Sequence, residues 1–148
     1  MHAQIKDSRG FTLTELIVAM VVATILIAIA VPGYNSYVRK ARRTDAKTAV
    51  LDLASLEERF FSTSNSYSST PSDLGFASTA AWPQTVGSGY YTVSVSNVSA
   101  ATTTANATYT ITASAVGDQT NDQQCLTFSV TQSGTQSATP DPNGTCWK

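Results

Sequence analysis

The side chains that most often carry catalysis or bind metal ions are scarce in this chain of 148 residues. The one histidine is His2, and the two cysteines, Cys125 and Cys146, are too few for a cysteine-rich metal site. Asp, Glu, Lys and Arg make up 13% of the residues, about half of their usual share. The sequence also shows no convergent pair of nucleophile and base. We therefore expect a protein that is not an enzyme and that carries neither cofactor nor metal ion.

One carboxylate stands out by its position. Glu15 is the only charged residue between Arg9 and Arg39, and an apolar run follows it directly. In an apolar setting a carboxylate has to be matched by a cation or by hydrogen bonds. Thr12, three residues earlier, fits the capping box at a helix start, which would make the role of Glu15 structural. The alternative is that Glu15 awaits a positive partner, and these residues alone leave both interpretations open.

The apolar run is as long as a bilayer core is thick. Residues 16–31 contain a single polar side chain, Thr24, and residues 11–31 would form a helix of about 31 Å. A chain this small offers little to surround a buried core helix. Residues 31–34, which end the run, make a poor cleavage site for a secretory signal peptide. The run is therefore interpreted as a membrane-anchoring helix.

Helical periodicity continues beyond this run. Pro32 and Gly33 should bend the helix, because proline removes a hydrogen bond and clashes with the preceding turn. Past them, apolar residues recur at helical spacing and predict a helix that reaches about Phe61. This stripe consists of Ala46, Ala49, Leu53, Leu56 and Phe60. The first half of the helix is thus apolar all round, whereas the second half needs a packed surface on one side only.

Alternating residues later in the chain predict that surface. Residues 91–95, 108–113 and 126–131 place an apolar side chain at every second position, which is typical of an antiparallel sheet with one buried face. Residues 62–89 are interpreted as a loop pinned to the body by Tyr67, Leu74, Phe76 and Trp82. The predicted fold class is α+β. A long N-terminal helix, bent near Pro32, packs its C-terminal half on a sheet of three to four antiparallel strands.

The segment Gly10-Phe11-Thr12-Leu13-Thr14-Glu15, placed just before the apolar run, resembles the type IV prepilin signal. The resemblance implies that a prepilin peptidase cuts between Gly10 and Phe11 and that the new Phe11 amine is methylated. It also implies that Glu15 pairs with the Phe11 amine of a neighbouring subunit, which would match both charges in a dry filament core. The chain then divides into a leader (1–10), a membrane and filament-core helix (11–33) and an exported head (34–148).

Segments of the head resemble the PilE-type minor pilins of type IVa pili, so the resemblance covers nearly the whole chain. These segments are residues 37–46, 56–60, 89–93 and 109–113 and the ending Cys146-Trp147. The resemblance implies the type IV pilin fold. In an exported head the default state of Cys125 and Cys146 is a disulfide, and two reduced thiols are the alternative.

The basic cluster, Arg39, Lys40, Arg42 and Arg43, is open to two interpretations. The first is a solvated surface near the membrane that touches lipid headgroups or acidic residues of adjacent subunits. The second is a DNA-binding patch, which is disfavoured because residues 62–148 contain one lysine and no arginine. The cluster also outnumbers the cations before the apolar run, so charge counting alone would place the head in the cytoplasm. The prepilin-like signal and the cysteine pair favour an exported head instead.

The function indicated is that of a type IV pilus subunit, a minor pilin of low abundance that assembles into the pilus or primes it through its helix. The alternatives are a major pilin, a DNA-uptake pilin and a type II secretion pseudopilin. The expected partners are other pilins, the prepilin peptidase, the inner-membrane assembly platform and, before assembly, the membrane. Nucleic acid is not an expected partner. The expected location is the inner membrane, with the head in the periplasm, and then the pilus on the cell surface.

Overall fold

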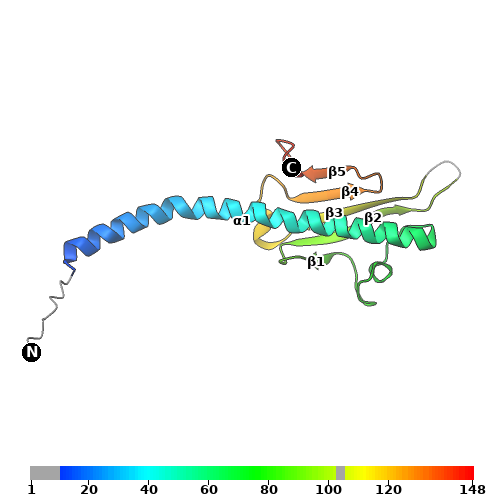
Figure 1. Ribbon diagram of the computed structural model, residues 1–148, viewed down its shortest axis with the longest axis horizontal. Helices are drawn as coiled ribbons and strands as arrows, with labels where there is room; N and C mark the ends of the chain where they lie inside the picture. The colour runs from blue at the N-terminus through cyan, green and yellow to red at the C-terminus, as the bar shows by residue number, and fades with distance from the viewer. Residues whose placement is uncertain (1–10, 103–105) are drawn as a thin grey trace, which may run out of the picture. The chain divides into compact units, whose positions relative to one another are not determined.

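The computed structural model describes residues 11–102 and 106–148 (Figure 1). The predicted leader, residues 1–10 with Gly10, lies outside the described residues. The chain divides into two compact units, Met1–Tyr37 and Val38–Lys148. The only α-helix of the described residues, α1 (Leu13–Ser64), begins in the first unit and ends in the second. It ends three residues after the predicted position, where Asn65 takes a left-handed backbone conformation with φ of 51°.

The second unit contains a five-stranded antiparallel sheet in the simple order β1-β2-β3-β4-β5. The strands are β1 (Gln84–Val86), β2 (Tyr91–Ser99), β3 (Thr108–Ala115), β4 (Thr127–Thr131) and β5 (Gln136–Thr139). The predicted α+β class and the three alternating strands are confirmed, but the sheet has five strands where three to four were predicted. Both additional strands, β1 and β5, lie at the sheet edges and are short and mostly polar. Pairing with a neighbour stabilises them, because they are too short to show a buried face of their own.

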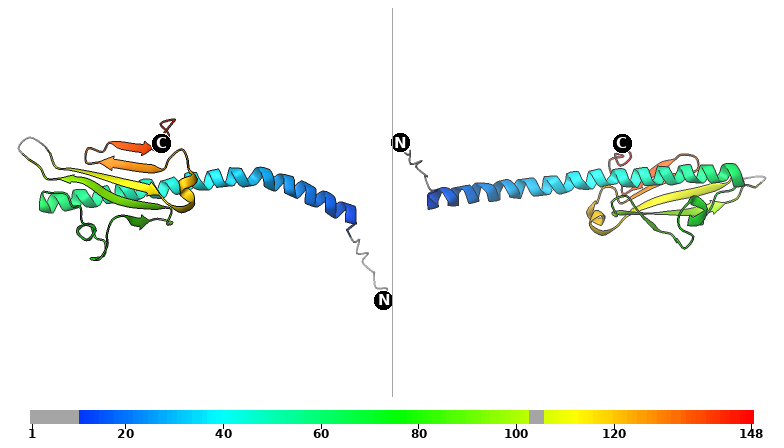
Figure 2. Two further views of the ribbon diagram at one scale, coloured as in Figure 1. Left: turned by 180° about the vertical axis from the view of Figure 1, so that it is seen from behind. Right: turned by 60° about the horizontal axis from the view of Figure 1, so that its bottom comes forward.

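The C-terminal half of α1 lies across one face of this sheet. Figure 2 shows the same unit from behind, with the strands in front of the helix. The register lines up Val93 with Ala113 and Ala113 with Phe128, and all three side chains point to the buried face. The buried side chains of β2, β3 and β4 therefore form one continuous apolar surface against the helix.

The helix residues that pack against this surface differ slightly from the predicted stripe. Ala46 and Leu53 are buried as predicted, but Val50 and Glu57 are buried as well, whereas Ala49 is only partly covered. The true stripe runs at spacings of four, three and four residues, which follows the 3.6-residue period more closely than the predicted one.

The segment between α1 and β2 is more ordered than a plain loop. It contains the 3-10 helix η1 (Pro71–Leu74) and strand β1. The four predicted anchors do contact the core: Leu74 is buried, and Tyr67, Phe76 and Trp82 pack against it. A second 3-10 helix, η2 (Gly117–Asn121), follows β3 and reaches the start of the C-terminal half of α1.

Candidate functional site

The first unit exposes an apolar surface. From Leu13 to Val31 all side chains of α1 are exposed, including Ile17 at 49% and Ile29 at 71%. The most apolar 18-residue window of the helix has a mean hydropathy of 2.7, so the helix is long and apolar enough to cross a membrane. An apolar surface of this size marks a contact with lipid or with other proteins.

The predicted site residue Glu15 lies at the start of this surface. The Thr12 hydroxyl oxygen accepts a hydrogen bond from the Glu15 backbone N–H at 3.3 Å, which is one half of a capping box. Within residues 11–102 and 106–148, the Glu15 carboxylate makes no hydrogen bond or ion pair. Phe11, the residue after the predicted cleavage point, is 81% exposed. The helix start is thus capped by Thr12, and the carboxylate is left for another partner.

Pro32 and Gly33 lie inside α1, and both are exposed. The helix is not interrupted there. The predicted bend at these two residues stays a prediction.

The two cysteines are joined in a disulfide, with 5.8 Å between the Cα atoms of Cys125 and Cys146. Asp141 positions the second cysteine, because its carboxylate accepts the backbone N–H groups of Thr145 and Cys146. Trp147 then donates its indole N–H to the Ser137 carbonyl oxygen at 2.8 Å. The disulfide therefore fastens the C-terminal tail to the end of the sheet at β4 and β5.

The basic cluster is largely bound to its own head, which differs from the expected solvated face. Arg43 makes a bidentate ion pair with Asp122, with N–O distances of 2.6 and 2.7 Å. Arg42 lies 3.3 Å above the centroid of the Tyr90 ring, and Arg39 donates to the Asn121 carbonyl oxygen. Lys40 is the one cation of the cluster for which the described part of the chain provides no partner.

The Arg43–Asp122 pair is supported by a buried amide. The side-chain nitrogen of Gln119 in η2 lies within hydrogen-bond distance of the Asp122 carboxylate, the Tyr91 hydroxyl and the Arg39 carbonyl oxygen. Burial alone would raise the pKa of Asp122, but the hydrogen bonds from Arg43 and from the Gln124 and Cys125 backbone, together with the Arg43 charge, outweigh burial and lower it. Asp122 is therefore held ionised between α1 and η2. Sequence patterns did not identify this contact, since 79 residues separate its partners.

A cleft with basic side chains lies beside this pair. It has a volume of about 320 Å³ and lies between α1 and the C-terminal tail. Its lining includes Lys40, Arg43, Lys47 and Lys148. Burial and the neighbouring Arg43 guanidinium lower the pKa of Lys47, whose ammonium group donates to the Lys148 carbonyl oxygen at 3.2 Å. The cleft has the chemistry of a weak anion site.

Glu57 is a buried acid that the sequence analysis missed. Its side chain is 0% exposed, one carboxylate oxygen accepts the Ser68 backbone N–H at 3.0 Å, and the other has no partner in the described chain. Burial raises its pKa; the Ser68 bond lowers it, and the charges of Glu58 and Asp73 add to the rise. The helical period from Ala46 and Leu53 indicates that this position is buried. A glutamate at such a position is nevertheless predicted from sequence to face the solvent. In the ranges that the structure describes, no group of three His, Cys, Asp or Glu side chains is placed to hold a metal ion.

Comparison with known protein families matches both the N-terminal segment and most of the head. The prokaryotic N-terminal methylation motif matches residues 5–31. A family model described as "Type IV minor pilin ComP, DNA uptake sequence receptor" matches residues 32–129, about two thirds of the chain. The chain belongs to this type IV minor pilin family. The predicted pilin class is thus confirmed, and with it a structural rather than a catalytic family.

Individual relatives match shorter parts of the pilin. The "Type IV major pilin protein PilA" of Myxococcus xanthus (strain DK1622) is 36% identical over 70 residues, which cover 47% of this chain and 32% of that protein. The "Prepilin peptidase-dependent protein D" of Escherichia coli (strain K12) is 54% identical over 37 residues, 25% of either chain. The match thus spans no more than a third of either relative. A type IV pilin structure from Shewanella oneidensis, at 23% identity, covers 74% of this chain and 98% of that one, with a TM-score of 0.47.

Proposed function

We propose that the pilin is anchored in the inner membrane by residues 11–33, cut between Gly10 and Phe11, methylated at the Phe11 amine and inserted into a pilus. The observation that carries this proposal is the largely apolar part of α1 over residues 13–31, which is exposed and carries one carboxylate without a partner in the described chain. Lipid covers this surface first, and the helices of other pilin subunits cover it after assembly. The prepilin peptidase, the inner-membrane assembly platform and other pilins are the partners that this route requires.

Glu15 supplies the pairing that directs assembly. In a core without water, its carboxylate is stable only beside a cation, and the processed Phe11 amine of a neighbouring subunit is the matching group. One carboxylate and one amine per subunit give the required one-to-one ratio. The Thr12 cap supports this role, because it satisfies the backbone at the helix start without using the carboxylate.

Substitution of Glu15 tests the proposal against a capping role. Glu15→Ala should abolish recovery of the pilin in sheared pili and leave the unfolding transition of the head unchanged. Thr12→Ala, which removes the cap but keeps the carboxylate, should assemble nearly as well as the unsubstituted chain. Equal losses in both variants would show that Glu15 acts only in the cap. A normal level of Glu15→Ala in pili would refute the assembly role.

Processing and orientation are tested on the purified protein. The intact mass should equal that of residues 11–148 with one additional methyl group, and a chain that still begins at Met1 contradicts the cleavage site. The head should be digested by protease added to the outside of spheroplasts. The disulfide supports this orientation, since such bonds persist in oxidising compartments. Protection of the head in intact spheroplasts would place it in the cytoplasm.

DNA binding is a second candidate function, favoured by the description of the matching family. The basic cleft is where this chain offers phosphate contacts. Lys47→Gln combined with Lys148→Gln should weaken binding of duplex DNA by the purified pilin and reduce its dependence on salt. Asp118→Asn, at an exposed position that does not line the cleft, should not weaken it. If the unsubstituted pilin does not retain duplex DNA at low salt, this second function is excluded.

A further inference from the structure

Two tyrosines lie just beyond the apolar run of α1. Tyr34 is 68% exposed and Tyr37 is 72% exposed, and both belong to the first unit, which ends at Tyr37. Residues three apart share one face of a helix, so the two side chains lie on the same side of α1. Val38 is the first residue of α1 that is partly covered. Both rings are therefore left open to a partner outside the described chain.

The position of the two tyrosines suits the boundary of a bilayer. A tyrosine has an apolar ring with a polar hydroxyl at its tip, which favours the level between acyl chains and headgroups. The polar layer on each side of the apolar core is about 5–7 Å thick. Tyr34 lies three residues, about 4.5 Å, beyond Val31, where the apolar run ends. Tyr37 lies about 9 Å beyond it, but helical side chains point toward the N-terminus, so this ring reaches back toward the same layer.

Glu15 lies at the other end of the same run. It precedes Tyr34 by 19 residues of α1, which correspond to about 28 Å along the helix. The apolar core of a bilayer is about 30 Å thick. With Tyr34 at one boundary, Glu15 therefore lies at the opposite one. A shift of the helix toward the head would draw the Glu15 carboxylate among the acyl chains, where a charge is unfavourable.

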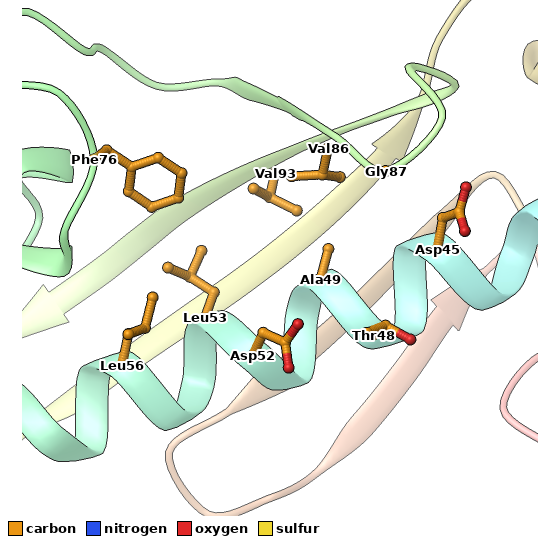
Figure 3. A pocket seen from close by; sticks show the side chains of 10 residues that line it. All are labelled: Asp45, Thr48, Ala49, Asp52, Leu53, Leu56, Phe76, Val86, Gly87 and Val93. Carbon is orange, nitrogen blue, oxygen red and sulfur yellow. The ribbon is translucent and has the colours of Figure 1, made fainter.

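The head has an apolar groove of its own, but its carboxylates make it unsuited to lipid. The groove has a volume of about 370 Å³, and Figure 3 shows side chains from α1 and from the strands converging on it. Leu53, Phe76 and Val93 belong to its apolar lining, whereas Asp45 and Asp52 lie along its helix edge. Carboxylates are rarely found among acyl chains. The lipid-facing surface of α1 therefore ends at the two tyrosines.

We propose that Tyr34 and Tyr37 bind the boundary between acyl chains and headgroups on the head side of the inner membrane, and so fix the depth of α1 before assembly. This inference rests on the proposed function, because it requires residues 11–33 to span the bilayer. The partner is the phospholipid layer, in which the rings lie beside the upper acyl chains and the hydroxyls meet the ester and phosphate oxygens. As a consequence, Glu15 stays at the opposite boundary until a neighbouring subunit pairs with it.

Quenching by brominated lipid measures the depth of each position. The full-length pilin is reconstituted in phosphatidylcholine vesicles whose acyl chains carry bromine either close to the headgroup or close to the terminal methyl group. Tyr34→Trp and Tyr37→Trp should each be quenched about twice as strongly by the shallow bromine as by the deep one. Val22→Trp, in the middle of the span, should show the reverse order. The fluorescence of Trp82 and Trp147 in the unsubstituted pilin is subtracted. Equal quenching at both tyrosine positions by the two lipids, or quenching by neither, overturns the proposal.

Serine variants test whether the tyrosines set the depth. In the Val22→Trp pilin, the further changes Tyr34→Ser and Tyr37→Ser should lower the ratio of deep to shallow quenching, because the helix loses its anchor. Asn35→Ser, at the same level but on another face of α1, should leave this ratio unchanged. An unchanged ratio in the double serine variant, or an equal shift with Asn35→Ser, refutes the anchor. The two proposals fail separately. If neither lipid quenches Val22→Trp, the membrane span of the proposed function is absent, whereas deep quenching of Val22→Trp that does not depend on the tyrosines removes only the anchor.

Discussion

The two halves of α1 are one helix in two different surroundings. Over residues 16–31 its side chains are exposed and, except for Thr24, apolar, whereas from Val38 onward one stripe is buried against the sheet of the same chain. A helix that is apolar all round requires an apolar environment, and the second half makes its own. The stability of the head therefore depends on the second half of α1, and we expect the assembly of the pilin to depend on the first half.

The largest loss of stability is expected from a charge placed on the buried stripe of α1. Val50 is 0% exposed, so Val50→Asp buries a carboxylate without a partner and should cost about 4 kcal/mol or more, a large part of the total stability of a domain. The cooperative unfolding of the head, followed by the fluorescence of Trp82 and Trp147, should disappear.

Leu51→Asp is the matched control for this prediction. Leu51 is the next residue on the same helix and is 46% exposed. Its substitution should change the free energy of unfolding by about 0.5 kcal/mol or less. Equal effects at positions 50 and 51 would contradict the observed packing of α1 on the sheet.

Removal of the disulfide should weaken the head without affecting the apolar half. Cys125 and Cys146 are 21 residues apart, and opening a loop of this size should cost about 3 kcal/mol. The double variant Cys125→Ser with Cys146→Ser should unfold at a lower urea concentration, by an amount that reductant also produces in the unsubstituted pilin. Its retention in the membrane fraction should be unchanged. If neither the double substitution nor reductant lowers the urea midpoint, the disulfide does not stabilise the head.

The Arg43–Asp122 pair should make the stability of the head depend on pH in the acidic range. The pKa of Asp122 is lowered in the folded chain, so the ionised form stabilises the fold. This contribution is present above the ordinary range of an aspartate, about pH 4, and is lost as the pH falls through the lowered pKa. Asp122→Asn should cost about 2 kcal/mol at pH 7, and the difference from the unsubstituted pilin should shrink below about pH 4. A difference that stays constant down to pH 2 would exclude the ion pair as its cause.

The smallest effect is expected in the apolar half. Ile25 is 56% exposed, so Ile25→Ala should leave the unfolding of the head unchanged. The same substitution at Ile111, which is 0% exposed in β3, should cost about 2–5 kcal/mol. Thermal unfolding of both variants in detergent measures the contrast. A loss of head stability in Ile25→Ala would show that the two halves are not independent.

The predictions from sequence succeeded where a regular pattern carries the signal. Period-two alternation located β2, β3 and β4, and helical spacing located Ala46 and Leu53 on the buried side of α1. The patterns missed β1 and β5, because edge strands of three and four residues take their structure from the neighbour they pair with. They also missed Glu57, since helical spacing indicates a position but not whether a charged residue there is buried.

The sequence alone determined the apolar anchor, the motif from Gly10 to Glu15, and which segments form strands and which form the helix. Each of these depends on residues close together in the chain. Only the tertiary structure decided how the basic cluster is used. It brings Arg43 to Asp122, Arg42 to Tyr90 and Arg39 to Asn121, and it leaves Lys40 without a partner in the described chain. It also forms the groove edged by Asp45 and Asp52. Contacts between residues 48 to 82 positions apart depend on how α1 lies on the sheet, and no local pattern encodes that placement.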